Sequence, residues 1–177
     1  MAESLLHFAV PFAILAILGI NLKKGFVVSL MALLPDFDIP LYVHRCYFHS
    51  LIMIMAIMLP IILITKRMRR CEDLSILITI VLLSHLVLDI FGGSIPVFWP
   101  ILNMNVGVDT QLLFHYPQIS NSYPQIQIHI EPAVFKSFQT FDAPLFTSGG
   151  VAVTALLIAP VLAKIFIDRF KKQQAKF

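Results

Sequence analysis

Four apolar segments, each close to the length that crosses a bilayer, constrain this chain more than any other feature. They cover residues 4–22, 48–65, 74–91 and 148–170, and a shorter one covers residues 25–34. A spanning helix needs about 20 mostly apolar residues. Only 13% of the 177 residues are charged, whereas soluble domains carry about 25%. The sequence therefore predicts a mainly α-helical integral membrane protein, a single domain over residues 1–177 with about four transmembrane helices and one short or re-entrant helix.

Clusters of lysine and arginine predict how these helices are oriented. The clusters follow the first, second and last apolar segments, at residues 23–24, 66–70 and 169–176. Because cytoplasmic loops carry an excess of basic residues, all three clusters are expected in the cytoplasm. We therefore expect a multi-pass protein of the inner or plasma membrane, with its N-terminus outside and its C-terminus cytoplasmic.

The loop of residues 92–147 is external in this orientation. Its segment QIQIHIE, residues 125–131, alternates polar and apolar residues, a pattern that predicts a half-buried strand. We expect a small, partly β cap over the site. His129 and Glu131 would share one face of the strand. They could add a metal ligand, but a solvated loop is the preferred interpretation of these residues and of Asp109, His115 and Asp142.

The same orientation gathers the ionisable residues of the apolar region at the outer face of the membrane. Ionisable groups at membrane depth are costly and usually mark function. Imidazoles and carboxylates together suit zinc or a similar divalent ion. The sequence therefore predicts a metal site at this face, drawn from His7, Asp36, Asp38, His44, His49, His85 and Asp89.

Two aspartate motifs in this set have structural alternatives. His85 and Asp89 are four residues apart, so they share one face of a helix, and they could bind a metal or simply hydrogen-bond to hold helices together. Asp36 and Asp38 lie between Pro35 and Pro40, which predict a stretch outside regular helix. An extended stretch would offer both carboxylates to one site, whereas a turn or helix cap is the structural alternative.

The segment around His44 and His49 predicts a helix start. The two histidines are five residues apart and converge only if His44 precedes the helix and His49 lies in its first turn. Ser50 and the apolar run after it suit such a start. Arg45 could bind a phosphate or pair with an aspartate, although an arginine at a membrane edge commonly extends its side chain to the interface.

These motifs together resemble the signature of the membrane-bound metal-dependent hydrolases, a family that includes the LexA-regulated inner-membrane protein YdjM. The resemblance is carried by His7, LLPDFDIP, HRCYFHS and SHLVLDIFGG followed by FWP. It runs through the first part of the chain, to Pro100, with the same spacing inside each motif. The family has glycine and threonine where this chain has Cys46 and Phe48.

The family is in turn similar to zinc-dependent phospholipase C and its related single-strand nucleases, helical proteins whose zinc ions serve phosphodiester hydrolysis. The resemblance implies one or two divalent metal ions, with zinc expected. The metal ligands that it implies are His7, Asp38, His49, His85 and Asp89. The residues that it implies for catalysis, as general base, support or substrate contact, are Asp36, Asp38, His44 and Arg45.

The expected function is a membrane-embedded, metal-dependent hydrolase, with a phospholipase C-like phosphodiesterase as the preferred class. Its partner is membrane lipid and its substrate an amphiphilic phosphoester. Basic residues do not interleave with aromatic ones, so the sequence does not predict nucleic-acid binding. The alternatives are a metal-binding transporter, and a non-catalytic membrane protein whose polar cluster fixes helix packing.

Overall fold

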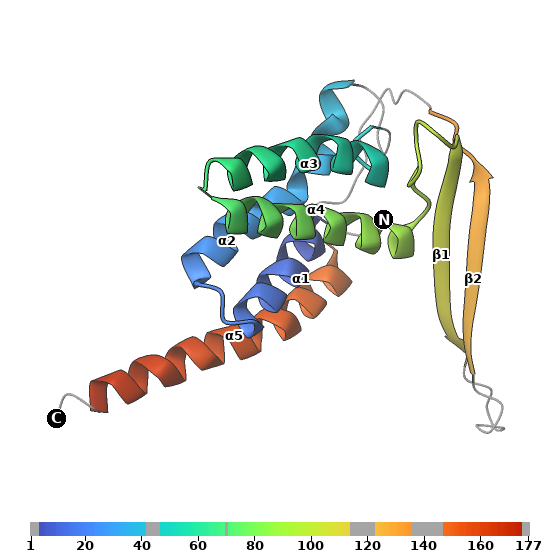
Figure 1. The fold of residues 1–177 in the computed structure, drawn as a ribbon. Helices are drawn as coiled ribbons and strands as arrows, with labels where there is room; N and C mark the ends of the chain where they lie inside the picture. Colours follow the sequence, from blue (N-terminus) through green and yellow to red (C-terminus); the bar gives the residue numbers. More distant parts are fainter. Residues whose placement is uncertain (1–3, 42–46, 70, 114–122, 136–146, 175–177) are drawn as a thin grey trace.

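The computed structural model describes residues 4–41, 47–69, 71–113, 123–135 and 147–174, and it is mainly helical (Figure 1). The prediction of a mainly α fold with a small β element is confirmed. In chain order the elements are α1 (Ser4–Ile17), α2 (Leu22–Leu30), the 3-10 helix η1 (Met31–Leu41), α3 (Leu51–Arg67), α4 (Glu72–Gly92), β1 (Met104–Leu113), β2 (Tyr123–Pro132) and α5 (Ser148–Gln174).

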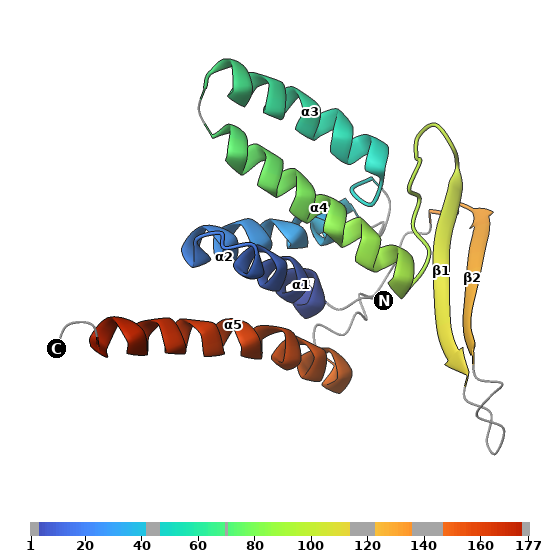
Figure 2. The same cartoon turned by 60° about the horizontal axis from the view of Figure 1, so that its bottom comes forward.

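Helix α4 is the centre of the fold. It contacts α1, α2, η1, α3 and β1, whereas α5 packs only against α1 among the described elements (Figure 2). Of the most apolar 18 residues of α4, 39% are buried, whereas the corresponding share in α5 is 17%. Small residues of α1, Ala13 and Ala16, let α5 approach closely at Val161. Polar residues on α4 therefore have neighbours on several sides.

Two apolar clusters fix α4 against its neighbours. One joins α3 and α4 to the segment after α4, through Ile54, Met58, Leu82, Leu86, Ile95 and Val97. The other joins α4 to α1, α2 and η1, through Leu15, Val28, Ala32 and Val81. Where lipid surrounds the helices, contacts of this kind stabilise the fold through close van der Waals packing. These apolar contacts fix the positions of η1, α3 and α4 relative to one another near their polar residues.

Two helices in the described part of the chain are long and apolar enough to cross a membrane. They are α4 and residues 148–167 of α5. The helix predicted over residues 4–22 ends at Ile17 instead, because Gly19 adopts a left-handed φ of 80° and closes the turn with an N–H bond to the carbonyl of Ala16. Its 14 residues rise about 21 Å, less than the hydrocarbon core of a bilayer. The prediction of four spans is therefore supported for two helices.

The short helix predicted over residues 25–34 is present with different bounds. It begins at Leu22, and the Asn21 side chain caps it by accepting hydrogen bonds from the N–H groups of Lys23 and Lys24. The 3-10 helix η1 follows directly and contains Pro35. The chain around Asp36 is a 3-10 helix, so of the two predicted alternatives the extended stretch is not adopted. Proline fixes φ near −65°, a value that a 3-10 helix also uses. The regular geometry is interrupted at Phe37 alone, at φ −77° and ψ 17°.

The predicted strand over residues 125–131 lies within β2, which pairs with β1 as an antiparallel hairpin. Ile95, just after α4, forms a bridge to Val106 of β1. Gly107 lies so near Gly93 and Ser94 that a Cβ there would sit 3.0 Å from the Gly93 carbonyl. This close approach attaches the hairpin to the C-terminal end of α4 (Figure 1).

Candidate metal site

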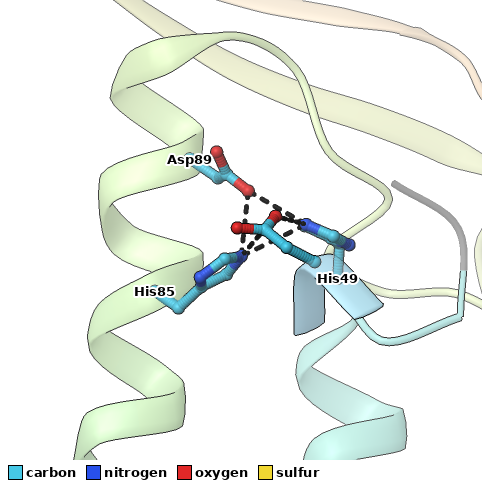
Figure 3. A group of neighbouring side chains, drawn as sticks. His49, His85 and Asp89 are labelled. Atoms are coloured by element: carbon cyan, nitrogen blue, oxygen red, sulfur yellow. Dashed lines mark hydrogen bonds and ion pairs between the residues drawn. The ribbon is translucent and has the colours of Figure 1, made fainter. Parts of the chain in front are cut away.

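Helix α4 supplies two side chains of the site, His85 and Asp89. One helical turn separates them, so they project from the same face, and Nε2 of His85 lies 3.2 Å from Oδ2 of Asp89. Both are almost completely buried, with 0% and 2% of their surface exposed. Figure 3 shows both side chains turned toward His49.

The start of α3 positions His49. Ser50 is the N-cap of this helix, and its hydroxyl oxygen accepts a hydrogen bond from the N–H of Met53. The Ser50 hydroxyl also donates to the carbonyls of Val97 and Trp99, in the segment after α4. The predicted helix start is therefore confirmed, with His49 one residue before the cap and not in the first turn.

His49 meets the α4 pair at hydrogen-bonding distance. Its Nε2 lies 3.1 Å from Oδ2 of Asp89 and 3.2 Å from Nε2 of His85. The side chain of His49 is fully buried. Two imidazoles and one carboxylate, from α4 and from the residue before the α3 cap, therefore point at one small buried volume (Figure 3).

Asp36 of η1 completes the cluster. Its Oδ1 lies 3.5 Å from Nε2 of His49 and 3.6 Å from Nε2 of His85. One ligand atom from each of Asp36, His49, His85 and Asp89 lies within 4.8 Å of all the others. Asp36 is the accessible member, with 27% of its side chain exposed.

The spacing of these four atoms fits a divalent ion. Nitrogen and oxygen ligands about 2.1 Å from a zinc ion, at tetrahedral angles, are about 3.4 Å from each other. The nitrogen–oxygen distances here are 3.1, 3.2, 3.5 and 3.6 Å, and the two Nε2 atoms are 3.2 Å apart. Two imidazoles and two carboxylates are also the donor types that zinc accepts. The Asp36–His49–His85–Asp89 cluster can therefore hold a metal ion.

Comparison with known families identifies the chain. Residues 3–170 match the sequence model of the YdjM inner membrane protein family. The chain belongs to the YdjM family. The match extends well past Pro100 and so includes the hairpin and most of α5. No curated protein and no solved structure gives a significant match.

Family membership and the two apolar helices together indicate a membrane protein. The multi-pass topology and the outside N-terminus stay predictions. His7 lies in the first turns of α1 and Asp89 in the last turn of α4. Figure 2 shows these two helix ends on the same side of the molecule as the start of α5. This arrangement agrees with the predicted gathering of polar residues at one face.

His7 adjoins the cluster but approaches it from another side. Its ring stacks on that of His85, with centroids 3.9 Å apart, and its Nε2 lies 3.6 Å from Oδ1 of Asp89, the oxygen turned away from the other two histidines. It is 1% exposed, and neither ring nitrogen has a hydrogen-bond partner among the described residues. Pro11 in α1 also has no N–H to donate to the carbonyl of His7. The role of His7 as a ligand stays a prediction.

The surroundings of Asp36 favour its charged form. Burial raises the pKa of this carboxyl, while the hydrogen bond from His49 and the charges of the neighbouring imidazoles lower it by more, so the pKa lies below its ordinary value. An ionised carboxylate is the form that binds a metal or accepts a proton. The direction of this shift therefore suits Asp36 to metal binding.

Several predicted site residues cannot be placed. His44 and Arg45 lie outside the described residues, as does the side chain of Asp38. Their predicted roles as ligand, support or substrate contact stay predictions. The structure therefore unites Asp36, His49, His85 and Asp89 and sets His7 beside them.

The sequence interpretation missed the role of Ser50 in tying two segments together. It recognised the helix start, but the donation to the Val97 and Trp99 carbonyls links residues far apart in the chain. A serine directly after a candidate ligand and before an apolar run is the one local signal that pointed to this residue.

The hairpin carries a separate histidine–aspartate pair. Nε2 of His129 lies 3.0 Å from Oδ2 of Asp109, and the two side chains are 43% and 59% exposed. The predicted partner on the same strand face, Glu131, is also exposed. Among the described residues, no third metal-binding side chain converges on this pair.

Proposed function

We propose that this protein is a membrane-embedded, metal-dependent hydrolase that cleaves a phosphoester in a lipid or another amphiphilic molecule. The observation that carries the proposal is the convergence of four ligand atoms within 4.8 Å, from three buried residues and one accessible one. A buried polar cluster of this kind is costly unless its members are paired or coordinate a metal.

His49, His85 and Asp89 would hold the ion. They come from α4 and from the start of α3, which apolar packing and the Ser50 cap keep in fixed relation. A bound divalent ion would make a water nucleophilic at neutral pH and stabilise the charge that develops on a phosphoryl oxygen. Three protein ligands with one position left for water is the usual arrangement in catalytic zinc sites.

Asp36 would act as the proton acceptor at the open side of the site. It is the accessible member, and it has the longest distances to the two imidazoles. In an alternative arrangement Asp36 stays a fourth ligand, which would give the closed coordination of a structural zinc site. The two arrangements differ in whether Asp36 is needed for metal retention or only for turnover.

The substrate class rests on the family resemblance and on the place of the site. The cluster lies at one end of a helix long and apolar enough to cross a membrane. A substrate that reaches this depth must be compatible with lipid. The resemblance to zinc-dependent phospholipase C adds the phosphodiester bond. Arg45, predicted near this site, is the candidate contact for a phosphate oxygen.

A non-catalytic cluster that fixes helix packing is the second candidate, and one observation favours it. The two Nε2 atoms of His49 and His85 are 3.2 Å apart, which a hydrogen bond between neutral imidazoles would also explain. In that case the cluster would be satisfied by its own members and would bind no ion.

Metal analysis and a hydrolysis assay separate these candidates. The full chain, purified in detergent and dialysed against trace zinc, should retain one or two equivalents of metal by elemental analysis. It should also hydrolyse a chromogenic phosphodiester or a fluorescent phospholipid, with loss of turnover in chelator and recovery on addition of zinc. Absence of stoichiometric metal supports the packing cluster. Bound metal without chelator-sensitive turnover on either substrate argues against the hydrolase.

A further inference from the structure

A groove of about 410 Å³ lies between the C-terminal end of α1 and the middle of α5. Most of its lining is apolar, with Ile17 and Leu22 on one wall and Val161 on the other, and the polar side chains in it are those of Asn21 and Lys164. Small-molecule sites commonly have volumes of about 300–1,000 Å³. We call this hollow the α1–α5 groove, and it is large enough to hold part of an organic ligand.

The groove forms because α1 ends while α5 continues past it (Figures 1 and 2). Ala16, near the end of α1, still packs against Val161 of α5. Gly19 then turns the chain away from α5 through its left-handed φ of 80°, and a Cβ built on Gly19 would meet no atom within 4 Å. Beyond the contact of Ala16 with Val161, the space beside α5 is therefore open.

The groove lies at the end of the molecule away from the candidate metal site. Its α5 wall includes Lys164, about 24 Å along the helix from Ser148 at 1.5 Å per residue. The hydrocarbon core of a bilayer is about 30 Å thick. If α5 crosses the membrane, Lys164 therefore lies close to one boundary. The turns between α1 and α2 and between α3 and α4 lie on this same side (Figure 2).

Lys164 is the one charged residue in residues 148–167, the stretch of α5 apolar enough to cross a membrane. A cation at membrane depth is costly unless it is paired or reaches the interface. None of the described residues that line the groove is acidic. The acidic residues at this end of α4, Glu72 and Asp73, line a different pocket together with Lys24 and Arg69. The groove therefore combines an apolar surface with positive charge.

We propose that the α1–α5 groove binds an anionic phospholipid, with an acyl chain against the apolar lining and the head-group phosphate at Lys164. The hydrocarbon core contains no water, so acyl chains fill a groove that opens to it. The Lys164 ammonium and the Asn21 amide can both donate to phosphate oxygens. Basic pockets between transmembrane helices bind anionic head groups in this way.

A lipid in this groove would connect α5 to the rest of the fold. Among the described elements α5 packs only against α1, and a bound lipid would extend that contact past the end of α1. The groove and the metal cluster lie at opposite ends of the helices, so this lipid is not the proposed substrate. The inference therefore stands apart from the proposed hydrolase and would survive its failure.

Lipid titration of the full-length protein tests the charge of the site. The protein is purified in a neutral detergent, depleted of lipid, and titrated with phosphatidylglycerol or phosphatidylcholine of the same chain length, and native mass spectrometry counts the bound molecules. One phosphatidylglycerol should bind at least about fivefold more tightly than phosphatidylcholine. Lys164→Gln should abolish this preference, and Lys164→Arg should keep it. Lys66→Gln is the matched control, because Lys66 is an exposed lysine in the last turn of α3, outside the groove.

A second pair of variants tests the apolar part of the site. Ile17 and Leu18 are adjacent and similarly exposed, at 73% and 70%, but of the two only Ile17 lines the groove. Ile17→Trp should fill the groove and weaken binding of both lipids at the one high-affinity position, whereas Leu18→Trp should leave binding unchanged.

Three results would overturn the proposal. Equal affinities of the unmodified protein for the two lipids would show that the groove does not select an anionic head group. Equal losses in Lys164→Gln and Lys66→Gln would mean that lipid responds to the general positive charge of this end. Equal effects of the two tryptophan variants would place the bound lipid outside the groove.

Discussion

Two histidine–aspartate pairs of nearly equal length lie in different parts of this molecule. His85 and Asp89 of α4 are 3.2 Å apart and no more than 2% exposed. His129 and Asp109 of the hairpin are 3.0 Å apart, and each is more than 40% exposed. Distance alone therefore does not separate a candidate site from a surface contact.

Burial and convergence separate the two pairs. An exposed ion pair is worth about 0–1 kcal/mol, since water solvates both groups almost as well. A buried pair has lost that solvation and must be satisfied from within. Two further residues, His49 and Asp36, converge on the pair in α4. The comparison predicts that changes in the buried cluster affect metal binding and that changes in the hairpin pair do not.

The largest effect is expected from His85→Ala. Removal of an outer-sphere partner typically costs 10–100-fold in metal affinity, so loss of a direct ligand should lower affinity by at least about 100-fold. Elemental analysis and zinc titration of the purified variant measure this effect. The variant should still insert in the membrane, because apolar packing holds α4. Metal content equal to that of the unmodified protein would show that His85 is not a metal ligand.

The second effect separates binding from turnover. Asp36→Asn keeps the size of the accessible side chain but removes its charge and its capacity to accept a proton. If Asp36 is the general base, phosphodiester turnover falls by about 100- to 10,000-fold, while zinc stays bound within about tenfold of its original affinity. Parallel titration and turnover measurements distinguish this result from loss of metal. Zinc loss comparable to that of His85→Ala would assign Asp36 as a required ligand and favour the closed, structural site.

A third variant tests whether the N-cap of α3 positions His49 for metal binding. Ser50→Ala removes the α3 cap and the donor to two carbonyls, which should destabilise the protein by about 1–3 kcal/mol. It should also weaken zinc binding several-fold, because His49 is adjacent to the cap. Thermal unfolding in detergent, with and without zinc, measures both.

Ser75→Ala is the matched control for that variant. Ser75 is also a buried serine that hydrogen-bonds in a helix, but it lies in the first turn of α4, at the end away from the cluster. It should lower thermal stability without a change in zinc affinity. Equal zinc affinity in the Ser50 and Ser75 variants would show that the cap does not position His49.

Local patterns were sufficient to predict the helical part of the site. The four-residue spacing of His85 and Asp89 fixes a shared helix face, and Ser50 before an apolar run marks the start of α3. Which aspartate joins them was not predictable, since Asp36 reaches the imidazoles through the packing of η1 against α4. Both aspartates of the PDFD motif were equally good candidates on local grounds.

The bounds of the first helices show a similar limit. The number of consecutive apolar residues predicted a first helix that reached residue 22, but the left-handed conformation of Gly19 ends the helix early. Leu18 and Ile20 are as apolar as the helix before them, so hydropathy could not reveal the turn. The prolines around Asp36 predicted a stretch outside regular helix, because they lack an N–H, yet their φ also suits the 3-10 helix that forms.

The smallest effect is expected in the hairpin, where His129→Ala provides the matched counterpart of His85→Ala. Removal of this half-exposed imidazole should change the free energy of unfolding by about 0.5 kcal/mol or less. Zinc content and turnover should both equal those of the unmodified protein. The same titration and unfolding measurements apply to both variants, so the ratio of their zinc affinities is a direct test of the comparison. A loss of zinc in the His129 variant would mean that exposure does not distinguish the two pairs and that the hairpin contributes to metal binding.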